Sequence, residues 1–119
     1  MERFSIERTQ LGGDAYAVAV AGEIDLYAAP ALKRELLALV AHGGRRIVVD
    51  FVAASLFDST PLGVLLAVSK RIEPSGASLS VVCGEALLAF CARTGLDELL
   101  DVVAPRAEAA PPLRAAFAA

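Results

Sequence analysis

Hydrophobic patterns typical of strands and of helices alternate along the chain. The chain begins with the pattern of a β-hairpin. The first segment, residues 3–10, alternates between polar and apolar over a few residues, and a Gly-Gly-Asp turn signal stands at 12–14. The next segment, residues 15–25, is rich in Ala and Val, which suits a strand buried on both faces. We therefore expect the chain to begin with two antiparallel strands.

Helical periodicity follows the hairpin. From Leu32 onward, apolar side chains recur at positions i, i+4, i+7 and i+8, and the charged residues 33–35 fall on the opposite face. Pro30 stands in the first turn, where its missing N–H removes no hydrogen bond. The pattern predicts an amphipathic helix over 29–41, which the glycines after His42 end.

The rest of the chain alternates strands and helices. Short runs rich in Val and Ile predict buried parallel strands, and longer runs closed by Gly or Pro predict helices. The expected elements are strands over 45–53, 78–83 and 101–104, helices over 58–72 and 85–95, and a short helical continuation over 96–100. We therefore expect an α/β domain whose mixed, mostly parallel sheet has about five strands, begins with the hairpin and carries about four helices.

The whole chain, 1–119, is expected to form one domain with its core over about 4–103. The remaining segment, 104–119, is rich in Ala and Pro, and Leu113 and Phe117 are its only large apolar pair. Because these two residues are four apart, a short helix there would place them on the same face. The segment is therefore expected either to dock through this pair or to fray.

Composition and charge exclude several classes of protein. Hydrophobic residues make up 56% of the chain, which excludes intrinsic disorder for most of it. Lys and Arg number 11 against 14 Asp and Glu, and the net charge of −3 argues against a nucleic-acid partner. No charge-free run is long enough for a membrane-spanning helix, and the first residues lack the apolar stretch of a secretory signal. A cytoplasmic protein is expected.

Two cysteines, Cys83 and Cys91, lie within apolar segments. They are too few for a disulfide scaffold, and no second pair is present for a zinc site. Both are expected to be buried and reduced, with Cys91 on the core face of its helix near Leu87, Leu88 and Phe90. The alternative is a redox pair.

The strand order also predicts where functional loops gather. Strands joined through a helix run parallel, so their carboxyl ends lie at the same edge of the sheet. Asp25, the loop at 57–60 and the Gly84–Glu85 pair are therefore expected to share this edge. A plain structural interpretation of the loop is that Asp58 or Ser59 serves only as the N-cap of the helix that follows.

The helix expected over 58–72 is apolar on nearly all sides. The core-facing stripe is expected to contain Leu62, Leu65, Leu66, Ser69 and Ile72, and a second stripe Thr60, Gly63, Val64, Ala67 and Val68. Either a neighbouring helix or another protein must cover the second stripe. Gly63 costs about 1 kcal/mol of helix propensity relative to Ala, which indicates a close approach to the backbone there.

These residues resemble a known family. The blocks GEIDLYAAPALKREL, VVDFVAASLFDSTPLGVLLAVSKRI and RTGLDELLDVV are similar to the signature blocks of the STAS domain of bacterial anti-sigma factor antagonists. The resemblance implies a non-enzymatic protein that binds an anti-sigma factor with serine kinase activity. It further implies that this kinase phosphorylates Ser59 and so breaks the complex, and that a PP2C-type phosphatase restores it. Asp58 would be the acid that precedes the phosphoacceptor, and Asp25 the acidic loop residue beside it.

The expected partner surface combines this resemblance with the second apolar stripe. It comprises Asp25, Asp58, Thr60, Pro61, Gly63, Val64 and Ala67. Pro61 departs from the family, which often has Gly or Ala there, because proline removes a backbone donor from the loop that a kinase engages. The alternative function is a STAS subunit that docks, without phosphorylation, on an ATPase of a lipid-transport or transporter assembly.

An enzymatic function has little support in the sequence. Ser59 as a nucleophile would need a base within hydrogen-bond reach, and the only histidine, His42, is expected at a helix end that leads away from this edge. Asp25 and Asp58 alone make a weak acid-base or metal pair, so no metal site is expected. The glycine-rich motifs that bind nucleotides are absent from the sequence, and no cofactor is expected.

Overall fold

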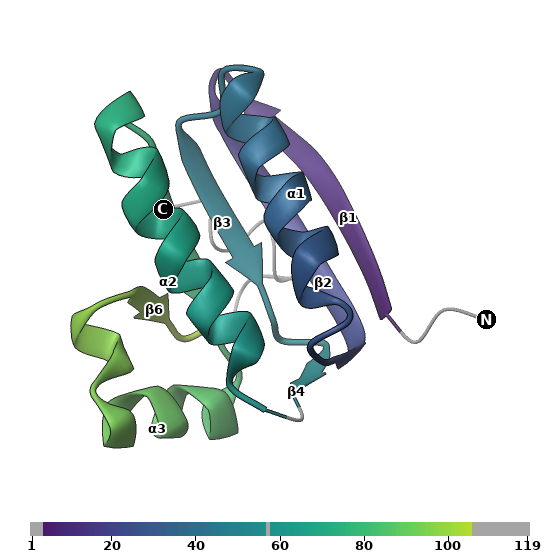
Figure 1. Cartoon of the computed structure of the whole chain (residues 1–119), viewed down its shortest axis with the longest axis vertical. Coiled ribbons are helices and arrows are strands. Elements are labelled where there is room, and N and C mark those ends of the chain that lie inside the picture. Colours follow the sequence, from purple (N-terminus) through teal and green to yellow (C-terminus); the bar gives the residue numbers. More distant parts are fainter. Residues whose placement is uncertain (1–3, 57, 106–119) are drawn as a thin grey trace.

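The computed structural model describes residues 4–56 and 58–105, which form a mixed sheet with helices packed on it (Figure 1). The strands are β1 (Phe4–Gly12), β2 (Ala15–Ile24), β3 (Arg46–Asp50), β4 (Ala54–Leu56), β5 (Ser78–Val82) and β6 (Asp101–Val103). The helices are α1 (Ala29–Ala41), α2 (Thr60–Ile72) and α3 (Glu85–Thr94), with the 3-10 turns η1 (Glu73–Ser75) and η2 (Leu96–Glu98). The helix expected near the C-terminus lies outside the described residues.

The sheet confirms the predicted fold class. Its strand order is β1-β2-β3-β5-β6, with β1 antiparallel to β2 and the other pairs parallel. The sequence pattern does not predict the short strand β4, which pairs in parallel with the end of β2 beyond the part that pairs with β3. β4 (Ala54–Leu56) contains none of the β-branched residues that mark β6, which is equally short, so no strand signal stands out there.

Helices α1 and α2 pack side by side over one face of the sheet (Figure 1). Beneath them Val18, Val49 and Val81, which are paired in register on β2, β3 and β5, form the centre of the core and are fully buried. α1 has the bounds that its periodicity predicts, and its leucines form the buried face. Because β2, β3, β4 and β5 run parallel, their carboxyl ends point toward one edge of the sheet.

Helix α2 is rotated slightly from the orientation that the sequence pattern predicts. Its buried residues are Pro61, Leu62, Leu65, Val68 and Ile72. Val68, which the pattern places on the second stripe, is buried in the core, whereas Leu66 and Ser69 are only half-buried. The reason is that Leu65, Val68 and Ile72 recur at steps of three and four and so share one face of the helix.

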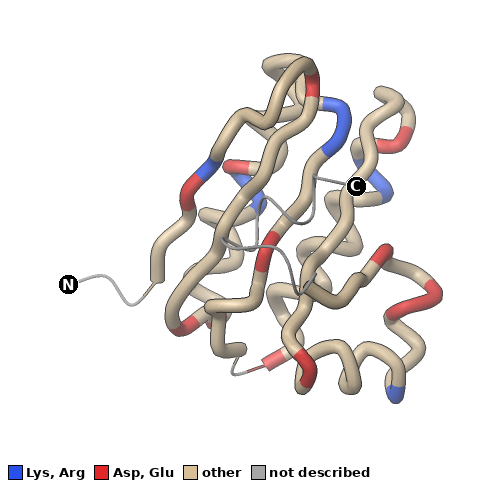
Figure 2. The backbone as a smooth tube through the Cα atoms, turned by 180° about the vertical axis from the view of Figure 1, so that it is seen from behind, with Lys and Arg blue, Asp and Glu red and all other residues tan. Residues whose placement is uncertain are grey.

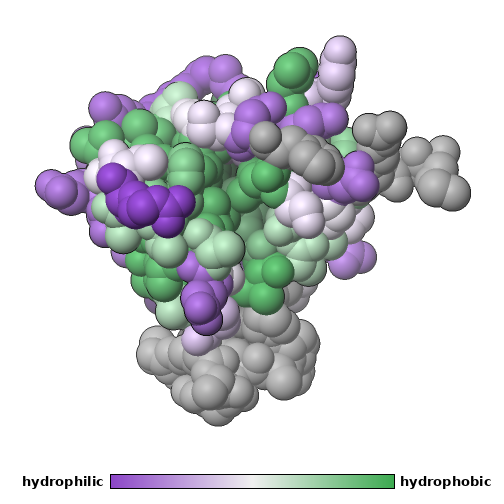
Figure 3. Space-filling view, turned by 90° about the horizontal axis from the view of Figure 1, so that it is seen from below, coloured by the Kyte–Doolittle hydropathy of each residue, from purple (hydrophilic) through white to green (hydrophobic). Residues whose placement is uncertain are grey.

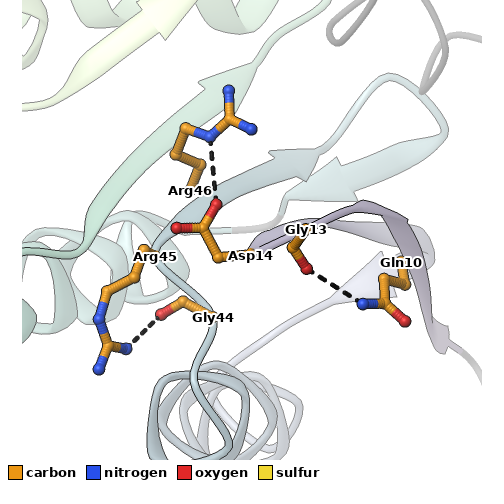
Figure 4. Close-up of polar contacts among 6 residues, drawn as sticks. All are labelled: Gln10, Gly13, Asp14, Gly44, Arg45 and Arg46. Atoms are coloured by element: carbon orange, nitrogen blue, oxygen red, sulfur yellow. Dashed lines mark hydrogen bonds and ion pairs between the residues drawn. The ribbon is translucent and has the colours of Figure 1, made fainter.

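Polar contacts tie the hairpin turn to the start of β3, at the end of the sheet where β2 begins (Figure 4). Asp14 Oδ1 and Arg46 Nε form an ion pair at 3.5 Å, and the Asp14 carbonyl accepts the backbone N–H of Arg45 at 2.8 Å. The Arg45 guanidinium donates to the Gly44 carbonyl at 2.7 Å. These contacts give the two adjacent arginines a structural role.

Both cysteines are free and buried, as the sequence predicts. Cys83 follows β5, and Cys91 lies in α3. Burial, together with the neighbouring Cys91, raises the pKa of the Cys83 thiol to about 12, and burial also raises the pKa of Cys91. Both thiols therefore stay protonated and unreactive near neutral pH.

Thiol titration of the folded protein at about pH 8 is expected to label neither cysteine within minutes. A pKa of about 12 leaves Cys83 with a thiolate fraction of roughly one in ten thousand at that pH, and the sulfur is out of reach of the reagent. After unfolding in guanidinium chloride, both are expected to react at once. Rapid labelling of either cysteine in the native protein would contradict this account of the core.

Candidate functional site

The ends of β2 and β4 bring two loops together at one edge of the sheet. β4 pairs in parallel with β2, with Leu56 opposite Ile24. The strands β2 and β4 therefore end side by side. Asp25 follows the end of β2, and the segment that leads to Ser59 follows the end of β4. The register therefore brings these two loops to the same edge, as the strand order predicts.

Ser59 is the N-cap residue of α2, but its hydroxyl makes no capping hydrogen bond. Instead the Asp58 carboxylate accepts the N–H of Thr60 at 2.8 Å. The Ser59 carbonyl accepts the N–H of Gly63 at 3.0 Å, which begins the helical hydrogen-bond pattern. Asp58 thus stabilises the start of the helix. The Ser59 side chain is exposed and makes no capping hydrogen bond.

The α2 residues expected at a partner surface differ in exposure. Thr60, Gly63 and Ala67 are exposed, and Val64 is half-buried against the core. Pro61 is buried, so it supports the first turn from below and does not belong to the exposed surface. A Cβ built on Gly63 meets no atom within 4 Å, so nothing in the fold itself requires a glycine there.

Asp25 holds the turn that leads from β2 into α1. Its Oδ1 accepts the N–H of Tyr27 at 3.0 Å and the N–H of Ala28 at 3.1 Å. Its carbonyl accepts the N–H groups of Ala28 and Ala29. The side chain that the sequence suggests for partner binding therefore has a structural role, which is to fix the turn beside the Ser59 loop.

A groove of about 790 Å³ opens between the starts of α2 and α3. Its walls are mainly apolar, and they include Phe51, Val52, Leu56, Leu62, Leu87 and Phe90. Asp58 and Ser59 line it on one side, and Gly84 and Glu85 line it on the other, so both predicted loops reach this edge. Figure 3 views the molecule from this end and shows apolar side chains gathered around a hollow.

Three exposed apolar residues at this edge are missed by reasoning from sequence. Tyr27 is 80% exposed, Leu26 54% and Val52 39%. Leu26 and Tyr27 belong to the turn that Asp25 holds, and Val52 lines the groove. The sequence gives little indication of this exposure, because all three residues lie in connections between helices and strands. The hydrophobic pattern there has no period that would predict burial or exposure. Large apolar side chains exposed together mark protein-binding surfaces.

Two carboxylates line the groove at this edge. In the described chain, the charged residues that line the groove are Asp58 and Glu85, with no lysine or arginine among them. Figure 2 shows acidic residues along the same lower edge together with a basic position, and Arg93 of α3 lies 6.0 Å from the ring centre of Phe90. An apolar groove with charged residues at its rim suits a protein partner.

His42 lies at the other end of α1 from this edge. It is the C-cap residue of that helix, and its Nδ1 is 2.7 Å from the Ala38 carbonyl. It is therefore not placed to act as a base for Ser59.

Within residues 4–56 and 58–105, no three His, Cys, Asp or Glu side chains group as a metal ion would require. Over the same ranges, no helix has the length and apolar character needed to cross a membrane.

Comparison with known proteins identifies the family. The family model described as Mlab, STAS domain matches residues 7–102. An anti-sigma-B factor antagonist of Bacillus subtilis (strain 168) is 36% identical over 88 residues, which cover 73% of this chain and 80% of that protein. One from Listeria monocytogenes is 30% identical over 99 residues, which cover 82% of this chain and 87% of that protein. The chain therefore belongs to the STAS domain family, among its anti-sigma factor antagonists.

Solved structures share the fold. An anti-sigma factor antagonist from Mycobacterium paratuberculosis superposes with a TM-score of 0.74 at 27% identity, covering 94% of this chain and 92% of that one. The Bacillus cell fate determinant SpoIIAA in its phosphorylated form gives a TM-score of 0.67 at 15% identity, covering 87% of this chain and 94% of that one. This second likeness is one of fold alone.

Asp25→Ala is expected to lower the free energy of unfolding by about 1 kcal/mol, because two backbone N–H groups lose their side-chain acceptor. Asp25→Asn is the matched control: it retains an acceptor oxygen and is expected to lose less than half as much. Urea unfolding followed by circular dichroism measures both. Equal losses in the two variants would show that the charge, not the acceptor, stabilises the turn.

Proposed function

We propose that this chain is a bacterial anti-sigma factor antagonist that binds an anti-sigma serine kinase and is switched by reversible phosphorylation of Ser59. The observation that carries the proposal is the exposed Ser59 hydroxyl, which leaves the side-chain capping of α2 to Asp58. A kinase can reach such a hydroxyl without breaking a hydrogen bond of the helix start. The relatives named anti-sigma-B factor antagonists support the class of partner.

The chemical step is a phosphoryl transfer at the start of α2. A bond forms between Ser59 Oγ and the γ-phosphorus of ATP, the bond from that phosphorus to ADP breaks, and the hydroxyl proton passes to a base of the kinase. The product carries about −1.5 to −2 charges at neutral pH. The positive end of the α2 dipole favours this charge, so the modified domain stays folded.

The same charge would oppose the complex. In the proposed interface the kinase covers Ser59 and the exposed α2 residues Thr60, Gly63 and Ala67, and the turn with Leu26 and Tyr27 supplies an apolar contact at the same edge. A phosphate beside the Asp58 carboxylate would have to be desolvated in that closed surface, which costs several kcal/mol. Removal of the phosphate by a PP2C-type phosphatase would restore binding. The proposal assigns no catalysis to this chain and places it in the cytoplasm.

A second candidate function is favoured by one residue, Pro61. Proline removes an N–H from the first turn of α2, which leaves fewer donors for a phosphate on Ser59. The candidate is a STAS subunit that docks on an ATPase of a lipid-transport or transporter assembly and is not phosphorylated. Affinity purification of the tagged chain from its native host distinguishes the two, since the co-purified ATPase is a small kinase-like protein in one case and a transporter ATPase in the other.

Incubation with the anti-sigma kinase and ATP, followed by phosphosite mapping, tests the switch. Phosphate is expected on Ser59, and Ser59→Ala is expected to bind the kinase normally and to remain unmodified. Ser59→Asp is expected to fold and to lose at least about tenfold in affinity, since it adds a charge at the interface centre. Thr60→Ala is the control and is expected to be phosphorylated normally. Phosphate on Thr60, or tight binding with no phosphate at all, would contradict the assignment of Ser59.

Ala67→Glu tests whether the exposed face of α2 is part of the interface. Ala67 is exposed, so the free energy of unfolding is expected to change by less than about 0.5 kcal/mol. Affinity for the kinase is expected to fall at least about tenfold, because the new carboxylate is desolvated in the interface. Ala92→Glu, at an exposed position of α3, is the matched control and is expected to bind normally. Unchanged affinity of Ala67→Glu in a calorimetric titration would exclude this face.

A further inference from the structure

The groove between the starts of α2 and α3 has the proposed phosphoacceptor among its lining residues. Asp58 and Ser59 line it on the α2 side, and Gly84 and Glu85 line it at the start of α3. Figure 1 shows the starts of both helices at the end of the domain where β4 lies. The groove volume of about 790 Å³ lies within the range of ligand-binding clefts in proteins, roughly 300–1,000 Å³. A phosphate on Ser59 would therefore stand beside a cleft that the fold has already formed.

Apolar side chains of the groove are partly in contact with solvent. Val52 is 39% exposed, and Leu87 and Phe90 on α3 are half-buried. Phe51 and Leu62, which also line the groove, are buried members of the core. An apolar side chain of a partner would remove this surface from water, which favours binding.

The charged side chains that line the groove have the same sign. Among the described residues, they are Asp58 and Glu85, and both are exposed. Arg93 lies 6.0 Å from the ring centre of Phe90 but does not line the groove. A phosphate on Ser59 would add about −1.5 to −2 charges to those of the two carboxylates. The groove of the phosphorylated chain is therefore complementary in charge to lysine and arginine.

A second copy of the chain does not match this chemistry. The exposed side chains of Leu26 and Tyr27 could enter the groove of a neighbouring copy. Such a pair would bring the carboxylates Asp58 and Glu85 of both copies together, and phosphorylation would add to the repulsion. The groove therefore favours a different protein, which supplies an apolar and a basic side chain together.

The phosphate would act on two partners with opposite sign. In the proposed function the kinase binds the unphosphorylated chain, and the phosphate on Ser59 releases it. A lysine or arginine in the groove would instead gain charge-assisted hydrogen bonds from the phosphate. The occupant is therefore a protein that binds the phosphorylated chain in preference to the unmodified one. In the proposed cycle that protein is the phosphatase.

We propose that the groove between α2 and α3 is the docking site of the phosphatase, which places an apolar side chain between the two helices and a lysine or arginine beside Glu85 when Ser59 is phosphorylated. This inference rests on the proposed function. The hydrolysis itself takes place at groups of the phosphatase: water forms a bond to the phosphorus, the bond from phosphorus to Ser59 Oγ breaks, and that oxygen takes up a proton.

Dephosphorylation kinetics of full-length chains with phosphoserine at position 59 test the charged part of this docking. Phosphoserine incorporated during translation makes the substrates independent of the kinase. The phosphatase is purified from the native host by its activity on the phosphorylated wild-type chain. Glu85→Lys is expected to raise KM at least about tenfold and to leave kcat within about twofold, because docking is weakened and the chemical step is not.

Glu98→Lys is the matched control. Glu98 is an exposed glutamate of η2 outside the groove, so its substitution changes the net charge equally and is expected to leave KM unchanged. If Glu85→Lys fails to fold in circular dichroism, Glu85→Gln replaces it, with an expected rise in KM of about threefold or more.

Val52→Asn tests the apolar part of the docking. It is expected to raise KM at least about fivefold, because a polar side chain then lines the space that the apolar side chain of the phosphatase enters. Val103→Asn is the matched control, since Val103 is 38% exposed but lies on β6, outside the groove. It is expected to leave KM unchanged.

Equal KM values for the wild-type chain, Glu85→Lys and Val52→Asn would overturn the docking site while the switch at Ser59 stands. Failure of the kinase to phosphorylate Ser59 would instead refute the proposed function on which the inference rests. A dimer in light scattering that Val52→Asn abolishes would assign the groove to a second copy of the chain and would also overturn the proposal.

Discussion

The parallel pairing of β4 with the end of β2 is the constraint on which the functional end of this domain depends. It sets Leu56 opposite Ile24, so that the Asp25 turn and the start of α2 leave the sheet side by side. β3 fixes the chain beside β2 as far as Asp50, and β4 extends this contact with β2 to Leu56. The connection before β4 supplies Phe51 and Val52 to the groove, and β4 itself contributes Ala54, Ser55 and Leu56.

Neighbouring residues at the site have different roles: some hold the loops in place, and others are exposed to a partner. Asp58 and Asp25 each accept backbone N–H groups and hold a turn, and Pro61 is buried beneath the first turn of α2. These contacts leave Ser59 with an exposed hydroxyl, and they place the apolar side chains of Leu26 and Tyr27 in solvent. The modification that we propose at Ser59 therefore changes the surface charge and leaves the contacts that hold the loop intact.

The order of elements could be predicted from the sequence because most of them are long enough to show a period. Pro30 and the leucines of α1 define that helix to the residue. β4 has no recognisable period, and a helix that is apolar on nearly all sides does not reveal its rotation, which explains why Val68 is buried against expectation. The spacing of residues alone left Ser59 as a possible plain N-cap, and only the family resemblance singled out its hydroxyl. The exposure of Tyr27 depends on a turn that the pattern does not encode.

Chemical-shift mapping of the ¹⁵N-labelled chain, titrated with its anti-sigma kinase, tests the location of the interface most directly. The account predicts that the largest amide shifts fall in the turn at 25–28, in the start of α2 over 58–67 and along the groove at 84–90, and that phosphorylation of Ser59 abolishes them at equal kinase concentration. Shifts centred instead on the hairpin turn at 12–14 and the start of β3 would place the partner at the opposite end of the sheet and contradict the account.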